Sequence, residues 1–361
     1  MISTTIHMGL PKTGSSSIQE FFKQNRELLG KTGIIYPKSL GLIAHRKLLA
    51  LAGREEYQKF DPDYISKNQN LINEEIMQKL RAELASIRAN RVIISCEDMA
   101  YAPHADYQRL LSCLNSCGLR VDIVVLYLRP QAEWRKSLIQ QRIKMGTWSN
   151  ERLYPLDDPK CCGKNGCYRD HVERRAAAFG MDKIKLRLFG REYFEGGDLY
   201  SEIKDAFTLP DMDYKAPLPM NVSLSDFACQ MLIHINKFLP RYDSSGRVCL
   251  RRLHIGQMTE RYLTATAEGW LVKASLPEGV GEKYERFYKE SNDWIRKNFF
   301  PSRKNLFNIK THEPIGIVGA TDLALKAKLA SERILSLREK VDIENFLKDL
   351  REELNKLPTL P

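Results

Sequence analysis

The sequence predicts an α/β protein in which a central parallel sheet is covered by helices on both faces, a three-layer sandwich. Three observations carry this prediction. Short apolar runs alternate with segments of helical periodicity through the first 220 residues, as in a chain that builds a parallel sheet. The runs at 91–96 and 121–128 are apolar without alternation, which is typical of strands covered on both faces. Beyond about residue 220 only helical periodicity remains.

The predicted elements follow in a regular order along the chain. Strands are expected at 2–8, 33–37, 91–96, 121–128 and 183–189. Helices are expected at 15–29, over Ile72–Ile87, and at 105–117 and 129–146, the last with Pro130 in its first turn. Further helices are expected at 223–239, 255–275, 281–300, 321–335 and 341–357. We therefore expect an α/β core at 1–220 and a helical C-terminal region at 221–361, packed on the core as one continuous domain.

The composition is that of a globular protein with a basic surface. Of the 361 residues, 43% are hydrophobic and 28% charged, which excludes a disordered chain. The formal charge of +11 favours anionic partners. Because Lys and Arg are spread along the whole chain, we expect no nucleic-acid partner.

The sequence also bears on location and redox state. The chain starts in the apolar run TTIHMGL without a basic leader, and no window approaches the about 20 apolar residues that cross a bilayer. We therefore expect a cytoplasmic protein without a transmembrane segment, and leave peripheral membrane contact open. The eight cysteines are too few for a disulfide framework in a chain of this length, so free thiols are expected.

The segment HMGLPKTGSSS, residues 7–17, resembles a displaced phosphate-binding loop. A triphosphate loop reads G-x-x-x-x-G-K-[ST], and Gly9 and Gly14 have that separation. However, Ser15 follows Gly14, and the lysine lies inside the loop as Lys12. Between a strand end and a helix start, such a loop presents backbone N–H groups to an anion. The segment therefore predicts phosphate or sulfate binding; the alternative is a glycine turn with a serine cap and no ligand.

The displaced lysine indicates group transfer rather than triphosphate hydrolysis. A triphosphate enzyme needs Mg²⁺ held by the loop and an acidic partner, a role that Glu97 and Asp98 could fill after the strand at 91–96. In a reaction whose leaving group is a phosphate ester, a lysine at the bridging oxygen stabilises the developing charge without a metal. The Mg-ATP kinase stays open as the alternative enzyme.

The sequence PKTGSSS at 11–17 resembles the 5′-phosphosulfate loop of sulfotransferases that use 3′-phosphoadenosine 5′-phosphosulfate (PAPS). In RPQAEWRKS, Arg129 at a strand end and Ser137 on the next helix resemble the 3′-phosphate site of that family. Eight helical residues rise about 12 Å, and a long Arg side chain can lean back so that both groups converge on one phosphate. The alternative is a surface Arg and a solvated Ser. The donor-binding residues that the resemblance implies are Pro11, Lys12, Thr13, Gly14, Ser15, Ser16, Ser17, Arg129 and Ser137.

The resemblance implies a P-loop-NTPase-like fold, PAPS as donor, 3′,5′-ADP (PAP) as product and no metal. Looser likeness at 221–239 and 288–300 to bacterial polysaccharide-type sulfotransferases implies a carbohydrate or glycolipid hydroxyl as acceptor. The segment PSRKNLF, which contains Arg303 and Lys304, lacks the glycine of the family's basic loop near the C-terminus. No role is therefore carried over to these two residues. A non-catalytic nucleotide- or glycan-binding relative is the second alternative, and the oligomeric state stays undetermined.

Two catalytic roles complete the predicted site. The resemblance makes Lys12 the stabiliser of the leaving phosphate, and transfer to a hydroxyl needs a base. Glu97 follows a strand at the expected ligand edge, as in glycan-type members of the family. Asp98 and His104 are the competing bases, and a salt-bridged Glu97 without catalytic role is the alternative.

A cluster of cysteines follows the helix expected at 129–146. Cys161, Cys162 and Cys167 lie close to His171 in CCGKNGCYRDH. Thiols with an imidazole can hold zinc, but no second cysteine pair has zinc-finger spacing. A polar loop with incidental thiols is therefore the favoured interpretation, with a loop disulfide as a third option in an exported protein.

Overall fold

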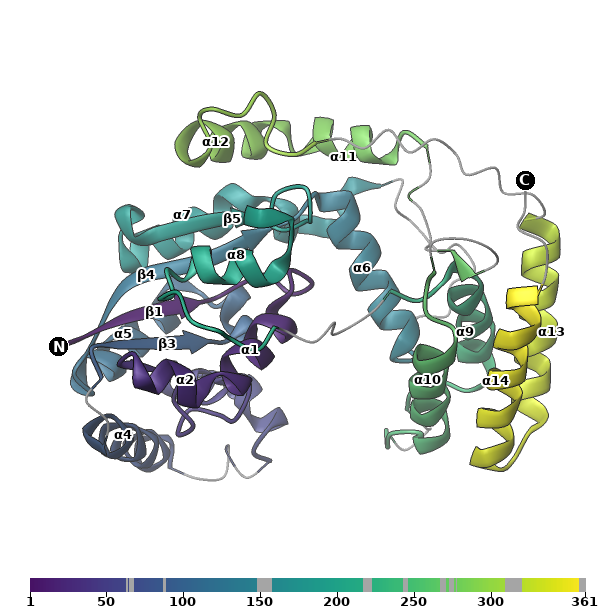
Figure 1. The fold of residues 1–361 in the computed structure, drawn as a ribbon, viewed down its shortest axis with the longest axis horizontal. Coiled ribbons are helices and arrows are strands. Elements are labelled where there is room, and N and C mark those ends of the chain that lie inside the picture. Colours follow the sequence, from purple (N-terminus) through teal and green to yellow (C-terminus); the bar gives the residue numbers. More distant parts are fainter. Residues whose placement is uncertain are drawn as a thin grey trace. The chain divides into compact units, whose positions relative to one another are not determined.

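The computed structural model contains a five-stranded parallel sheet in its described residues, in agreement with the predicted α/β class (Figure 1). The structure describes residues 1–62, 64, 68–86, 89–147, 158–216, 223–242, 246–266, 271–272, 276, 278–308 and 320–356. It divides into two compact units. Unit 1 comprises Met1–Arg129, Lys164–Met220 and Glu290–Leu306; unit 2 comprises Pro130–Gly163, Asn221–Lys289 and Phe307–Pro361.

The sheet belongs to unit 1. Its strands are β1 (Ile2–His7), β2 (Ile34–Ile35), β3 (Arg91–Ser95), β4 (Leu119–Leu128) and β5 (Ile184–Leu188), and their order in the sheet is β2-β3-β1-β4-β5. All four strand pairings are parallel. At the carboxyl end of β1, His7 is in register with Ser95 on one side and Val125 on the other. Each predicted strand is present, although β2 is shorter than the predicted 33–37.

Unit 1 also contains α-helices, several of which pack on this sheet. They are α1 (Ser15–Gln24), α2 (Arg26–Lys31), α3 (Lys47–Leu51), α4 (Gln69–Ser86), α5 (His104–Ser116), α7 (Tyr168–Phe179), α8 (Leu199–Ala206) and α12 (Lys289–Phe299). Side chains of α1, α2 and α8 share one buried cluster with Ile93, Val125 and Tyr127 of the sheet. Helices α5 and α7 pack on β4 and on each other. The arrangement is that of an α/β sandwich.

The helix predicted at 15–29 is interrupted, because Asn25 ends α1 and precedes α2. The Asn25 side-chain amide donates to the carbonyls of Phe21 and Lys215, and its oxygen accepts from the Lys215 backbone. A buried amide with partners 190 residues away in the chain therefore fixes this break. Periodicity along 15–29 contains no trace of such a contact.

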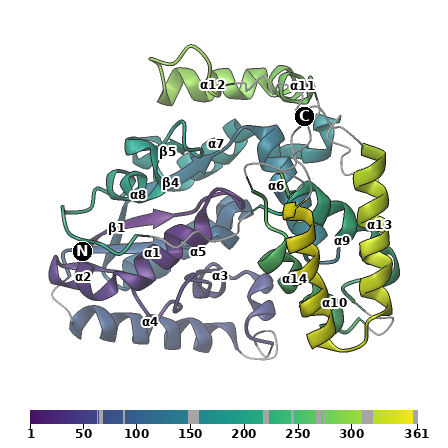
Figure 2. The same ribbon diagram turned by 45° about the vertical axis from the view of Figure 1, so that its right-hand side comes forward.

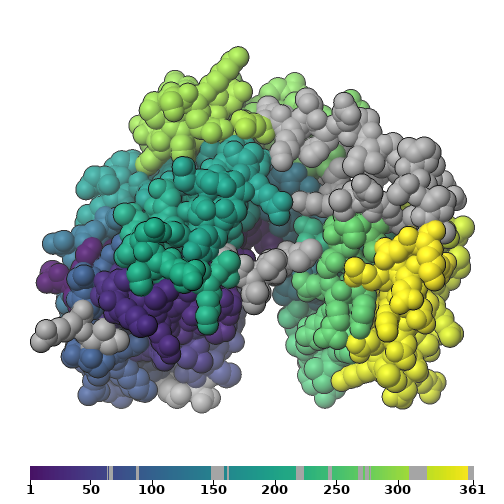
Figure 3. All heavy atoms as spheres, in the orientation of Figure 1, coloured from purple at the N-terminus to yellow at the C-terminus, as the bar shows by residue number. Residues whose placement is uncertain are grey.

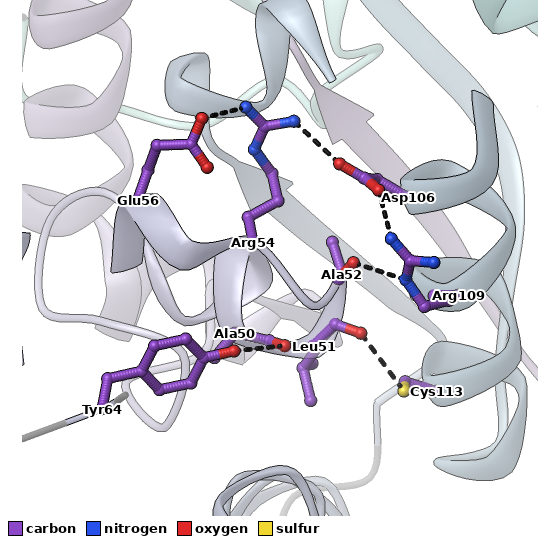
Figure 4. A network of polar contacts seen from close by, with 9 residues as sticks. All are labelled: Ala50, Leu51, Ala52, Arg54, Glu56, Tyr64, Asp106, Arg109 and Cys113. Carbon is purple, nitrogen blue, oxygen red and sulfur yellow. Dashed lines mark hydrogen bonds and ion pairs between the residues drawn. The ribbon is translucent and has the colours of Figure 1, made fainter. Parts of the chain in front are cut away.

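Helix α3 is anchored to α5 by a cluster around Asp106 (Figure 4). The Asp106 carboxylate accepts from Arg54 at 2.8 Å and pairs with Arg109. Arg109 also donates to the carbonyl of Ala52 at 2.8 Å, and Arg54 pairs with Glu56 at 2.5 Å. The cluster fixes the segment that carries Arg46 and His45 beside the turn after β3.

Unit 2 consists of helices around its own apolar core. They are α6 (Gln131–Lys144), α9 (Asp226–Phe238), α10 (Leu250–Tyr262), α11 (Val280–Phe287), α13 (Ala320–Ser336) and α14 (Lys340–Lys356). Helix α13 packs on α9, and α14 packs on α10 (Figure 2). Helix α14 buries Ile343, Leu347 and Leu354, and the yellow α14 lies against its neighbours in the space-filling view (Figure 3).

Two predicted helices of the second half differ from the structure. The helix predicted at 255–275 ends at Tyr262, and the chain then forms isolated bridges that pair Leu224 with Thr264 and Thr266 with Val272. The helix predicted at 281–300 is two helices, α11 and α12, with Tyr288 between them. The Tyr288 hydroxyl donates to the carbonyl of Pro159 at 3.0 Å, so a tertiary contact lies at this break as well. Among the helices of the described ranges, none combines the length and apolar composition needed to cross a bilayer.

Candidate functional site

The strand order places the segments that follow β1, β3 and β4 side by side at the carboxyl ends of the strands, which we call the sheet edge. Strand β1 lies between β3 and β4, so the residues that follow these three parallel strands emerge side by side. The Cys96 amide donates to the His7 carbonyl at 3.0 Å, and the Met8 amide donates to the Val125 carbonyl at 3.1 Å. In open parallel sheets, ligands bind in the crevice at the carboxyl ends of the strands, where the strand order reverses. The loop at 8–14 leaves the sheet at this point.

The loop holds two residues in the left-handed backbone region. Lys12 has φ 67° and Gly14 has φ 81°. A non-glycine residue in this region costs on the order of 1–3 kcal/mol and is typical of ligand-binding turns. A Cβ atom on Gly14 would overlap the ring of Phe189. The Thr13 hydroxyl donates to the Leu10 carbonyl at 2.5 Å and closes the turn from within. These contacts hold the loop in one conformation, in which Lys12 has a positive φ angle that non-glycine residues rarely adopt.

The loop ends at the N-terminus of α1, where an anion can bind. Gly14 occupies the N-cap position, and no side chain caps the helix; the alternative of a serine cap is therefore wrong. The Ser15 side chain is 2% exposed, and its hydroxyl lies close enough to the Glu97 carboxyl group to lower the pKa of that group. Backbone N–H groups of a first helical turn attract anions. The first turn of α1 therefore offers backbone donors to an anion, with the Ser15 hydroxyl between that turn and Glu97.

Arg129 reaches back to this loop from the end of β4. Its Nη1 donates to the Lys12 carbonyl at 3.3 Å, and its guanidinium lies 5.8 Å from the centroid of the Phe189 ring. The Tyr168 hydroxyl donates to the Arg129 carbonyl at 2.5 Å. The structure thus brings Arg129 and the Lys12 loop together. Ser137 is half-buried on α6 of unit 2, and its convergence with Arg129 stays a prediction.

Glu97 begins the 3₁₀ turn η2 (Glu97–Tyr101) directly after β3. Burial raises the pKa of its carboxyl group, and the neighbouring charge of Asp98 acts in the same direction. The Ser15 hydroxyl and the cations Arg46 and Lys12 lower that pKa but do not offset the burial. Glu97 is therefore close to the loop, and its carboxyl group holds a proton more firmly than an exposed glutamate does.

The competing bases have different surroundings. Asp98 forms an ion pair with Arg46, at 3.1 Å between Nε and Oδ2, and Arg46 also lies 4.5 Å from the ring centroid of Phe60. His104 is exposed at the start of α5, where its Nε2 lies 3.4 Å from the side-chain nitrogen of Gln108. Asp98 is thus paired with a cation and His104 is exposed, and the choice of Glu97 as the base stays a prediction.

Two further histidines lie beneath the site and are fully buried. The Ser95 hydroxyl lies 2.9 Å from His7 Nδ1, and the Ser95 amide donates to His45 Nδ1 at 3.1 Å. Burial lowers the pKa of His7 and of His45 to about 3. Both imidazoles are therefore neutral at physiological pH and belong to the support of the sheet edge. His7 Nε2 would lie 2.6 Å from a Cβ atom on Gly9, which shows why a side chain at position 9 is excluded.

Sequence reasoning missed Arg175, which lies under the same edge. This α7 residue is fully buried and donates to the carbonyls of Ala100 at 2.7 Å and Met8 at 3.4 Å. It stands in the polar stretch RDHVERRAAAF, which has the composition of a solvated helix. The sequence carries no signal that separates it from Arg174 beside it.

The cysteine cluster does not form a site in the described residues. Cys162 is buried in unit 2 with its Sγ 3.9 Å from the Tyr284 hydroxyl, whereas Cys167 precedes α7 in unit 1. His171 Nε2 lies 3.2 Å from the Asn165 carbonyl, and burial lowers its pKa to about 3. The Cys161 side chain lies outside the described residues. No three His, Cys, Asp or Glu side chains in the described ranges are grouped to hold a metal ion.

No protein-family model matches this chain. The curated proteins contain no match to it either.

Proposed function

We propose that this protein is a PAPS-dependent sulfotransferase that transfers a sulfuryl group to a hydroxyl of a carbohydrate or glycolipid. The observation that carries the proposal is the meeting of two motifs far apart in the sequence. The loop with the displaced Lys12 and the strand-end Arg129 lie at one sheet edge, with 3.3 Å between Arg129 Nη1 and the Lys12 carbonyl. A loop that only turned the chain would not need a left-handed lysine beside an arginine.

The donor-binding residues follow from the chemistry of the loop. The first turn of α1, with the Ser15, Ser16 and Ser17 hydroxyls, would hold the 5′-phosphosulfate. The planar fork of donors on Arg129 suits the 3′-phosphate, and Ser137 would add a hydroxyl to it. The central parallel sheet with its loop after β1 is compatible with the P-loop-like fold that we propose for unit 1.

The transfer itself needs one charge stabiliser and one base. The acceptor oxygen would form a bond to sulfur while the bond between sulfur and the bridging phosphate oxygen breaks. Lys12 would neutralise the negative charge that develops on this oxygen. Glu97 would take the proton of the acceptor hydroxyl, a role for which a raised pKa is useful because a stronger base accepts a proton more readily. The products are the sulfate ester and PAP, and no step requires a metal.

Calorimetry with PAP tests the donor site directly. We expect PAP to bind with the same affinity in buffer containing EDTA and in buffer containing Mg²⁺. We expect ATP to bind much more weakly than PAP in both buffers. ATP binding that requires Mg²⁺, together with no PAP binding, would instead identify a kinase.

Transfer of labelled sulfate from PAPS to a panel of oligosaccharides and glycolipids tests the reaction. The matched control is the Lys12→Ala variant, which should lose turnover with every acceptor that the wild type sulfates. Tight PAP binding without a sulfated product from any acceptor would contradict the enzyme and favour a binding protein. The panel also tests the acceptor class, and fractionation of cells tests the predicted cytoplasmic location.

A further inference from the structure

Arg175 joins three segments of unit 1 through one buried guanidinium. Its Nη1 donates to the His171 carbonyl of α7 at 2.9 Å. Its Nη2 donates to the carbonyl of Ala100, in the turn that Glu97 begins, and to the carbonyl of Met8, where the phosphate loop leaves β1. The side chain is 0% exposed. One side chain therefore links the loop of the donor site to the turn of the candidate base.

This arginine differs from the ordinary buried arginine, which is paired with a carboxylate. The half-buried Arg187 of the same unit has such a partner, with two bonds of 2.7 Å to the Glu202 carboxylate. The buried Arg252 of unit 2 resembles Arg175 instead, because it donates to the Asn236 side-chain oxygen and to the Ile143 carbonyl. The described groups that shift the pKa of Arg175 are two tyrosines and Arg174, and burial lowers this pKa. The guanidinium also lies 5.7 Å from the ring centroid of Tyr107. Carbonyl dipoles and an aromatic face thus hold a cation that no described acid neutralises.

A buried cation without an acidic partner is costly unless something nearby complements it. The nearest candidate is an anion at the phosphate loop, because Met8 immediately precedes Gly9 and the loop. In the protein interior such a charge is screened less by solvent and salt than a surface charge. The rigid fork of the guanidinium also fixes the two carbonyls relative to each other, which an ammonium group does less well.

We propose that Arg175 is a positioning residue that fixes the phosphate loop against the Glu97 turn and complements the phosphates of the bound nucleotide. The first part depends only on the ligand-free geometry, whereas the second rests on the proposed function. Arg175 contacts backbone carbonyls, so it acts on the reaction through Met8 and Ala100.

Hydrogen exchange of the ligand-free protein tests the first part. In Arg175→Gln and Arg175→Lys we expect faster exchange in peptides covering 8–14 and 97–101, and unchanged exchange in β5. Arg174→Gln is the matched control, because it removes the same charge from the adjacent, partly exposed position on α7. Equal exchange of both peptides in wild type and Arg175→Lys would overturn the coupling. Faster exchange of β5 to the same extent would show a general loss of stability and would also overturn it.

Binding and kinetics test the second part. We expect Arg175→Gln to weaken PAP binding about tenfold, which equals about 1.4 kcal/mol, and Arg174→Gln to change it less than twofold. Arg175→Lys keeps the charge and should retain PAP affinity within about threefold, while kcat falls about tenfold or more with little change in KM. If Arg175→Gln does not fold, Arg175→Lys alone tests the second part: PAP affinity should be retained while kcat falls, and a kcat equal to that of the wild type would refute it.

The outcomes separate this inference from the proposed function. Absence of PAP binding to the wild type would refute the proposed function and the second part, but the exchange data would still decide the first. Wild-type PAP binding with equal affinities in Arg175→Gln and Arg174→Gln would refute the role of the charge while leaving the sulfotransferase proposal intact.

Discussion

Replacing Arg129 by alanine removes a side chain that already points at the loop in the ligand-free protein. The lost contacts are the 3.3 Å bond to the Lys12 carbonyl and the packing on Phe189. A hydrogen bond to a charged group contributes about 1.5–3 kcal/mol. At about 1.4 kcal/mol per factor of ten, PAP affinity should fall about 10-fold to 140-fold. Because the guanidinium is oriented before the nucleotide binds, little of this energy is lost to ordering the side chain.

Calorimetric titration of PAP into Arg129→Ala measures this effect without turnover. Arg120→Ala is the matched control, because Arg120 lies on the same strand at the opposite end and is exposed beside Asp122. It removes the same charge and should leave the dissociation constant within about twofold. An unchanged constant for Arg129→Ala would remove this residue from the site. An equal loss in both variants would show a general effect of net charge and would refute the reasoning.

Three further predictions concern Glu97 and Gly14. Glu97→Gln should lower kcat about 100-fold or more and leave the PAP dissociation constant nearly unchanged; a kcat within twofold of wild type would exclude this base. The pKa of Glu97 is higher in the folded protein than in the unfolded chain. The folded protein is therefore destabilised as the pH rises from the unfolded-state pKa to the folded-state pKa, because Glu97 loses its proton less readily when it is buried. The acid limb of the kcat/KM profile, which reports the free enzyme, should therefore lie above pH 4.5, the ordinary value of a glutamate. Glu97→Gln should raise Tm at pH 7 but not at pH 3, and equal shifts at both pH values would contradict this cause. Gly14→Ala should lower Tm and abolish PAP binding, because φ is 81° and Cβ would overlap Phe189, whereas Gly30→Ala, where a Cβ meets nothing within 4 Å, should do neither.

Much of the sheet could be predicted from the sequence because its strands are locally encoded. The apolar runs at 91–96 and 121–128 lack alternation, and such runs form strands buried on both faces whatever lies beside them. The loop at 9–14 is local as well, since two glycines and a lysine fix its chemistry before the chain folds. The parallel α/β class and the position of the loop after β1 are therefore confirmed.

Where helices end depended on contacts that local periodicity does not contain. Asn25 interrupts the predicted helix through hydrogen bonds to Lys215. Tyr288 separates α11 from α12 and bonds to Pro159. After Tyr262 the chain forms isolated bridges instead of continuing its helix, and one of them pairs Thr264 with Leu224, 40 residues earlier. Lys215, Pro159 and Leu224 all lie far along the chain from these helix ends, and a propensity summed over one window cannot include them.

The sequence by itself determined the chemistry of two segments, the displaced-lysine loop and the strand-end arginine, and the class of sheet that carries them. Only the tertiary structure decided that β1 lies between β3 and β4, which brings Lys12, Glu97 and Arg129 to one edge. It also decided that Arg175 is buried beneath that edge while Arg174 beside it is not. The physical reason is that strand order and burial depend on what packs against a residue from elsewhere in the chain, whereas the chemistry of a side chain does not.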